Sequence, residues 1–232
     1  MSRRFRIPLI IVGALLLLLC GGGIWLWLAF RHVPHFYVEA LAMDSAEQQQ
    51  ASEKMIRRTA ELRNDALKDG HWEAVFTAEQ INGWLAVDRE RNHRQLIPPE
   101  FHDPRVAIHD GELIVGCRYE KGNVNTVLSL TAEVYLQAPN VLGVRLERAR
   151  AGAVPLPLND VIHQLRSGCE SIGCKVELRE VGADPLLFLT LPLPANPGRD
   201  GIIRVETVEL HEGELHVAGQ TVRPGHTRHV AH

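Results

Sequence analysis

Histidine is the residue type that most invites a metal hypothesis in this chain, with 12 copies among 232 residues. His226, His229 and His232 recur at every third position near the C-terminus. They follow a Pro-Gly pair and belong to no apolar pattern that would hold them in place, whereas a metal site needs fixed ligand geometry. We therefore predict a flexible tail over residues 224–232 and no metal there.

The four cysteines give no clear metal site either. Cys169 and Cys174 could form a disulfide in an oxidising compartment, and a single Cys-x4-Cys pair is a poor zinc signature. Cys117 is expected to be a small buried apolar residue, and Cys20 falls in an apolar run. We predict no bound metal and no cofactor.

Motifs of known catalytic sites are missing from the sequence. It contains no Gly-x-Ser-x-Gly, phosphate-binding loop, dinucleotide fingerprint or His-Glu-x-x-His. Ser129 and Cys117 could act as nucleophiles by residue type, but both fall in strand patterns without a base that the sequence nominates. We predict no catalytic residues and no enzymatic activity; the alternative is a hydrolase whose site is assembled from distant residues.

The overall composition is that of a globular protein, with 45% hydrophobic residues, 23% charged residues and a formal net charge of −3. These values argue against a disordered chain and against a nucleic-acid-binding protein. We expect residues 31–43 to form a short connector after the N-terminal apolar run, and residues 44–223 to form one globular domain.

Residues 7–30 form an uncharged apolar run that predicts a transmembrane helix. A helix of this length spans about 35 Å, and the apolar core of a bilayer is about 30 Å thick. Trp25 and Trp27 stand toward one end of the run, where amphipathic rings favour the membrane interface.

Flanking charge predicts the orientation of this helix. Three arginines lie within residues 1–6, and a single arginine follows the run closely before acidic residues begin. The positive-inside bias places residues 1–6 in the cytoplasm and the domain outside it, in the periplasm if the cell is Gram-negative. A cleaved signal peptide and a lipoprotein site at Cys20 are alternatives. The long apolar core and Leu19 before the cysteine favour an uncleaved anchor in the cell membrane.

Two helices are expected at the start of the domain. Asp44 with Glu47, and Thr77 with Gln80, each match a capping box at a helix N-terminus. Trp84 belongs to a compact apolar stripe on the second helix. Gly70 is expected to end the first helix.

From residue 104 the apolar period changes from helical to alternating, which predicts an α+β fold with a long curved antiparallel sheet packed on a few helices. One strand, residues 124–137, is unusually long. Its apolar face would line either an ordinary core or a groove for a lipid chain. That face carries Val124, Leu128, Leu130, Val134 and Leu136. A helix capped by Asn159 and further strands at residues 175–181, 186–191, 202–210 and 215–222 complete the expected elements.

One internal repeat joins two expected hairpins, residues 105–119 and residues 202–222. Residues 106–115 match residues 208–217 at an offset of 102, and His109 and His211 fall at the same turn position, where we expect them at the surface. A duplicated half-domain explains the match. Convergence explains it equally, because both turns need a glycine with positive φ.

The sequence also resembles the YpmS-like family of bacterial membrane-anchored proteins over roughly residues 34–222. The resemblance lies in the order Thr77-x-x-Gln80-Ile81-Asn82, a Pro-Arg-Val strand with an acidic-Gly hairpin, a long alternating strand, and Ala-Gly-x-x-Pro-Leu-Pro-Leu before a helix. More loosely it is similar to the tubular lipid-binding superfamily, in which a curved sheet wraps a helix around an apolar groove. The resemblance implies fold and location more than activity. It supplies as fold markers Thr77, Gln80, Asn82, Trp84, Pro155 and Pro157.

Two functions follow as hypotheses. The domain could bind or shuttle a lipid or another apolar ligand near the outer face of the membrane. Alternatively it could be a non-enzymatic partner of a cell-envelope protein complex, docking through an exposed sheet edge. In both cases the partners are the membrane and a lipid or protein within it, and no nucleic acid is expected.

Overall fold

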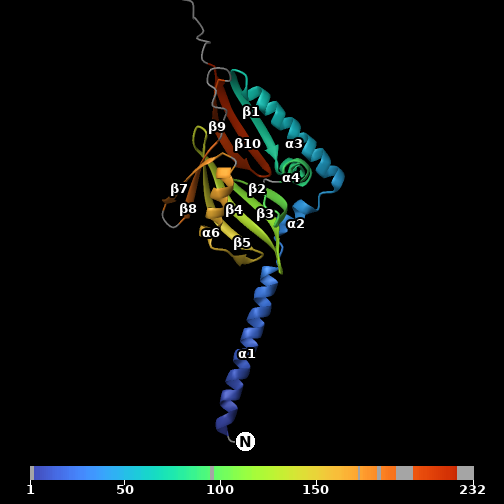
Figure 1. Cartoon of the computed structure of the whole chain (residues 1–232), viewed down its shortest axis with the longest axis vertical. Coiled ribbons are helices and arrows are strands. Elements are labelled where there is room, and N and C mark those ends of the chain that lie inside the picture. Colours follow the sequence, from blue (N-terminus) through green and yellow to red (C-terminus); the bar gives the residue numbers. More distant parts are fainter. Residues whose placement is uncertain (1–2, 95–96, 172, 182–183, 192–200, 224–232) are drawn as a thin grey trace, which may run out of the picture.

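The computed structural model describes residues 3–94, 97–171, 173–181, 184–191 and 201–223. The fold is α+β, as the sequence predicts: one N-terminal apolar helix is followed by two antiparallel sheets and a few helices. Figure 1 shows the helix extending from one end of the domain. The predicted C-terminal tail lies outside the described residues.

Three helices precede the first strand: α1 is Arg3–Phe30, α2 is His35–Leu41 and α3 is Ser45–Ala66. At 1.5 Å per residue, α1 is about 42 Å long. Within the part of the chain whose side chains are described, Leu17–Leu41 holds the helix that is long and apolar enough to cross a membrane. Residues 31–43, expected as a plain connector, contain α2.

Both predicted capping boxes are present. The Asp44 carboxylate accepts hydrogen bonds from the backbone N–H of Ala46 and Glu47, each at 2.8 Å, and the Glu47 carboxylate accepts from Asp44 N. Thr77 and Gln80 pair in the same way at the start of α4, Ala78–Ala86, which α5, Asp88–Asn92, follows.

The prediction that Gly70 ends α3 is wrong. The helix ends at Ala66, and Gly70, with φ at 123°, opens the first strand instead. A positive φ suits the entry to a strand as well as the end of a helix, so the glycine alone does not distinguish the two.

The strands form a three-stranded sheet, in the order β1-β10-β9, and a seven-stranded sheet with β2-β3-β4-β5-β8-β7 and β6 beside β5. The bounds are β1 Gly70–Thr77, β2 Phe101–His109, β3 Glu112–Lys121, β4 Val124–Ala138, β5 Val141–Ala151, β6 Val154–Pro155, β7 Lys175–Val181, β8 Asp184–Thr190, β9 Ile202–His211 and β10 Glu214–Val222. The long strand predicted from alternation is β4.

The two repeated hairpins, β2-β3 and β9-β10, meet turn to turn. Gly111 N donates to Leu210 O and Gly213 N donates to Ile108 O, both at 2.9 Å, so the two bonds are related by the same offset of 102 residues. The strand pairings match at that offset throughout, and both hairpins shift register at the same place. Convergence explains a shared turn but not a shared register shift with reciprocal contacts. These features favour the duplication.

The first strand of each hairpin has its outer edge capped by an asparagine. Asn82 on α4 exchanges two hydrogen bonds with the backbone of Val106 in β2, at 2.7 and 2.9 Å. Asn140, in the turn between β4 and β5, bonds Val205 N and Ile203 O in β9. A side-chain amide thus takes the place of the next strand at both edges.

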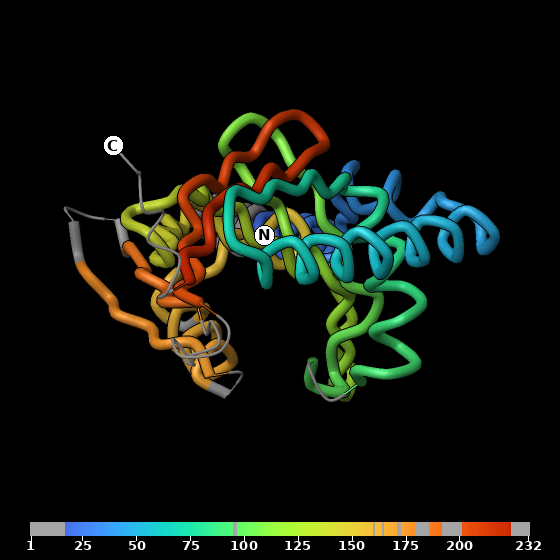
Figure 2. Tube along the Cα trace, turned by 90° about the horizontal axis from the view of Figure 1, so that it is seen from above, coloured from blue at the N-terminus to red at the C-terminus, as the bar shows by residue number. Residues whose placement is uncertain are grey.

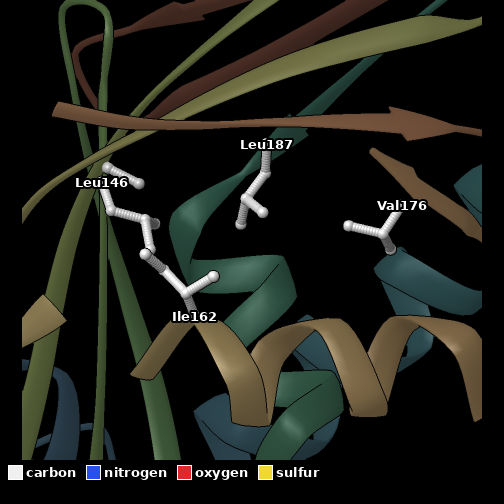
Figure 3. Close-up of a cluster of buried hydrophobic side chains, with 5 residues drawn as sticks. Leu146, Ile162, Val176 and Leu187 are labelled. Atoms are coloured by element: carbon white, nitrogen blue, oxygen red, sulfur yellow. The ribbon is translucent and has the colours of Figure 1, made fainter. Parts of the chain in front are cut away.

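The core of the seven-stranded sheet forms against α6, Leu158–Ser171. It is built from Ala132, Leu146, Ile162, Val176 and Leu187. Figure 3 shows Leu146 and Leu187 reaching from the strands toward Ile162 on the helix. Because α6 begins at Leu158, Asn159 lies in the first helical turn and not at the capping position where the sequence placed it.

Replacing Leu146 should destabilise the domain strongly. This side chain is 1% exposed, so Leu146→Ala leaves a cavity in the core and should lower the free energy of unfolding by about 2–5 kcal/mol. Leu178→Ala is the control, since Leu178 is 40% exposed and its loss should cost less than about 1 kcal/mol. Denaturant titration of the full chain in detergent, followed by tryptophan fluorescence, measures both, and equal losses would contradict this description of the core.

Candidate functional site

The most specific local geometry lies where α1 meets the domain. The last carbonyls of a helix have no partner within it. Here Ala29 O accepts a hydrogen bond from Ala153 N at 2.7 Å, and Phe30 O accepts one from Thr126 Oγ1 at 2.6 Å. These four residues, together with Gly152, are called the junction below. The domain therefore donates hydrogen bonds to the last two carbonyls of α1, of which Ala29 O also accepts one from His32 N at 3.2 Å.

Gly152 allows this contact for two separate reasons. Its φ is 60°, a left-handed conformation that other residues adopt only at a cost. In addition, a Cβ at this position would lie 2.5 Å from both Ala29 O and Phe30 O. Any side chain at residue 152 would therefore push α1 away from the turn between β5 and β6.

The short helix α2 is docked on the domain as well. Tyr37 is 2% exposed, and its hydroxyl donates to Asp103 O at 2.8 Å. The rings of Phe36 and Tyr37 lie over Gly116 in β3, where a Cβ would come within 2.8–3.0 Å of them. Asp103 itself has a positive φ of 47° and lies at the register shift of β2, which places its carbonyl beside α2.

Arg105 adds a buried cation at the C-terminal end of α2. Its guanidinium donates to Ala40 O at 3.3 Å and to Pro104 O at 2.8 Å, and its side chain is almost fully buried. A cation is favourable near the unpaired carbonyls at a helix C-terminus. Burial lowers the pKa of Arg105, and the nearby Asp103 carboxylate opposes that shift.

Together these contacts hold the chain between α1 and α3 at two places, the end of α1 and the whole of α2. A connector held only by its covalent bonds would let the domain rotate freely about α1. The arrangement sets the position of the domain relative to α1.

The five apolar residues predicted on β4 are spread along the strand. Val124 is 41% exposed at the end next to α1, whereas the other four are half-buried. Leu130 packs against the α6 core, so that part of the face is core and not groove. The two cavities described below are lined by none of the five.

The fold markers occupy structural positions. Asn82 caps β2, and Trp84 lies half-buried with its ring 5.8 Å from that of His93. Pro155 ends β6 and Pro157 directly precedes α6.

The cysteines are free thiols. Cys174 N donates to Cys169 O at 3.0 Å, so the predicted pair is adjacent at the end of α6, and the disulfide stays a prediction. Burial raises the pKa of the Cys117 thiol to about 11, which keeps it protonated and unreactive near neutral pH. Among the described residues no group of three or more His, Cys, Asp or Glu could hold a metal ion.

Two open cavities flank the region where the sheets meet. One, of about 430 Å³, lies between α2 and the two hairpin turns and has an apolar floor that includes Phe36, Ala78 and Ala107. Its rim carries two imidazole–carboxylate pairs, His35–Glu39 at 3.3 Å and His109–Glu212 at 2.9 Å. The other, of about 660 Å³, lies between α3 and the three-stranded sheet and is lined largely by charged residues.

Comparison of the chain with protein-family models, with curated proteins and with solved structures finds no match. The resemblance to the YpmS-like family therefore stays a prediction.

Sequence reasoning missed the junction. Gly152 was singled out only as part of the Ala-Gly-x-x-Pro-Leu-Pro-Leu motif, and Thr126 only as part of a strand. The sequence feature that could have drawn attention to this place is a proline-containing turn directly after a long strand. Nothing in the sequence says that the end of α1 lies against it, because residues 30 and 126 are joined only by tertiary structure.

Gly152→Ala should open the junction. The added Cβ both strains the backbone and meets two carbonyls of α1. If the docked state loses about 1.4 kcal/mol, the undocked population rises about tenfold, and trypsin should release the domain at Arg31 correspondingly faster.

The matched control for this substitution is Gly173→Ala. Gly173 also has a positive φ, of 85°, but nothing lies within 4 Å of its would-be Cβ. It should leave the rate of cleavage at Arg31 near that of the unaltered protein. Equal acceleration by both substitutions would show that backbone strain, and not contact with α1, is responsible.

Proposed function

We propose that this protein is a membrane-fixed docking module: a non-enzymatic domain, held at the outer face of the cell membrane, that presents a surface to another envelope protein. The observation that carries the proposal is the junction. Ala153 N and Thr126 Oγ1 bond the terminal carbonyls of α1 directly, so the helix and the domain form one body.

A fixed domain suits docking better than transport. A carrier that moves a ligand between membranes needs reach, which a long flexible linker supplies. Here the chain between Phe30 and Asp44 is shortened by α2 and tied down by Tyr37 and Arg105. Such a construction supports a role in which distance and orientation above the bilayer matter.

The surface most available for a protein partner is the outer face of α3. At 22 residues α3 is about 33 Å long, and Ala51 and Ser52 are its buried residues. Figure 2 shows α3 extending on one side of the domain, with α6, β7 and β8 (orange) on the other. Ile56, 46% exposed, stands among charged residues on α3. An apolar residue within a polar rim is typical of protein interfaces.

This proposal predicts a partner whose contact depends on the junction. A photoreactive amino acid at Ile56 of the full chain should give one reproducible crosslinked protein in native membranes. The yield should fall with Gly152→Ala, which displaces the domain, and should be unchanged with Gly173→Ala. Failure to obtain a reproducible product, or equal yields in all three proteins, would count against the module.

A second candidate function, binding of a lipid or other apolar ligand, is favoured by the smaller cavity. Its volume of about 430 Å³ and its apolar floor are within the range of small-molecule sites. The imidazole–carboxylate pairs on the rim could bind a polar head group while the floor takes an apolar chain.

Filling this cavity tests the second candidate. Ala107→Phe should abolish any lipid that remains bound to the full chain in native mass spectrometry, because the added ring occupies the floor. Ala218→Phe, in the larger cavity, is the matched control and should retain the lipid. A bound lipid that survives both substitutions, or the absence of lipid from the unaltered protein, would remove this candidate.

A further inference from the structure

The β3–β4 turn, residues 121–124, lies beside the end of α1. Lys121 and Val124 are paired at the end of the hairpin, and two residues later Thr126 donates to Phe30 O. Figure 1 shows the end of this hairpin as the part of the domain next to the C-terminal end of α1. The turn therefore extends past the junction in the direction of the helix.

The last turns of α1 carry side chains that mark a membrane interface. Trp25 and Trp27 are 69% and 53% exposed, and the guanidinium of Arg31 lies over the Trp27 ring at 4.4 Å. Tryptophan and arginine at the end of an apolar helix favour the headgroup region. Trp27 is about 4.5 Å along the axis from Phe30, and Val124 is about 7 Å along the strand from Thr126, so both lie close to the junction.

The turn carries an exposed apolar side chain. Val124, which pairs with Lys121 at the end of the hairpin, is 41% exposed, and Val33, three residues after the end of α1, is exposed to the same extent. The one cation of the turn, Lys121, lies 3.4 Å from the Glu100 carboxylate. The turn thus offers an apolar side chain, and its one positive charge is already paired. Such a surface suits a neutral headgroup region and needs no anionic lipid.

We propose that the β3–β4 turn is a second membrane contact, in which Val124 enters the headgroup region of the bilayer that α1 spans. The inference rests on the membrane anchor of the proposed function. It adds what a single helix lacks: two contacts with the bilayer limit the tilt of the domain over the membrane. The height of α3 above the bilayer is then the same for every partner.

Site-specific photocrosslinking to lipid tests this contact. The full chain is reconstituted into phosphatidylcholine vesicles with benzoylphenylalanine at Val124, and illumination should add the mass of one phospholipid at that residue. Val222 is the matched control, since it is 49% exposed and lies at the end of β10, beside the start of β1. That end of the domain is far from α1 in Figure 1, so residue 222 should give no adduct.

A third position distinguishes the contact of the turn from the membrane anchor. Benzoylphenylalanine at Trp25 should give the lipid adduct because that residue belongs to α1. An adduct at residue 25 but not at 124 overturns the contact of the turn and leaves the anchor intact. No adduct at either residue overturns the anchor and the contact together. Equal adducts at 124 and 222 also overturn the inference, because lipid would then react alike with residues at both ends of the domain.

Discussion

The hydrogen bonding of the last carbonyls of α1 is the constraint on which the arrangement of this protein depends. The last four carbonyls of a helix lack the N–H partner that earlier carbonyls find within the helix. Ala153 N and Thr126 Oγ1 meet two of these acceptors, and Gly152 leaves room for the approach. These hydrogen bonds hold the domain on the end of α1, and the positions of α2 and the β3–β4 turn follow from that contact.

The reciprocal contact of the two hairpin turns connects the sheet that meets α1 with the three-stranded sheet. β2 and β3 belong to the seven-stranded sheet that meets α1, whereas β9 and β10 belong to the three-stranded sheet that packs near α3. Their turns are joined by paired backbone bonds and by His109 with Glu212 at 2.9 Å. The two repeated hairpins therefore contact each other symmetrically, and this contact fixes the orientation of one sheet relative to the other.

Much of the fold could be predicted, because the patterns that indicate helices and strands arise between residues that are close together in the sequence. The capping boxes at Asp44 and Thr77 and the alternation along β4 depend on residues a few positions apart. Element ends were less certain: a glycine with positive φ serves a strand entry at Gly70 as well as it would serve a helix end. The junction could not be predicted, since its bond partners, Thr126 and Phe30, are 96 residues apart.

The asparagine caps decide how a protein partner can bind. A free strand edge invites another strand, and the sequence alone left docking through such an edge open. Asn82 saturates Val106 in β2, and Asn140 saturates the edge of β9, so neither edge can accept an added strand without first losing these bonds. Among the described strands, β1, β6 and β7 keep unpaired outer edges. β6 has two residues, β7 carries alternating charges that disfavour strand addition, and β1 lies beside α3 (Figure 1). Recognition through side chains on the outer face of α3 therefore needs the least rearrangement of the domain.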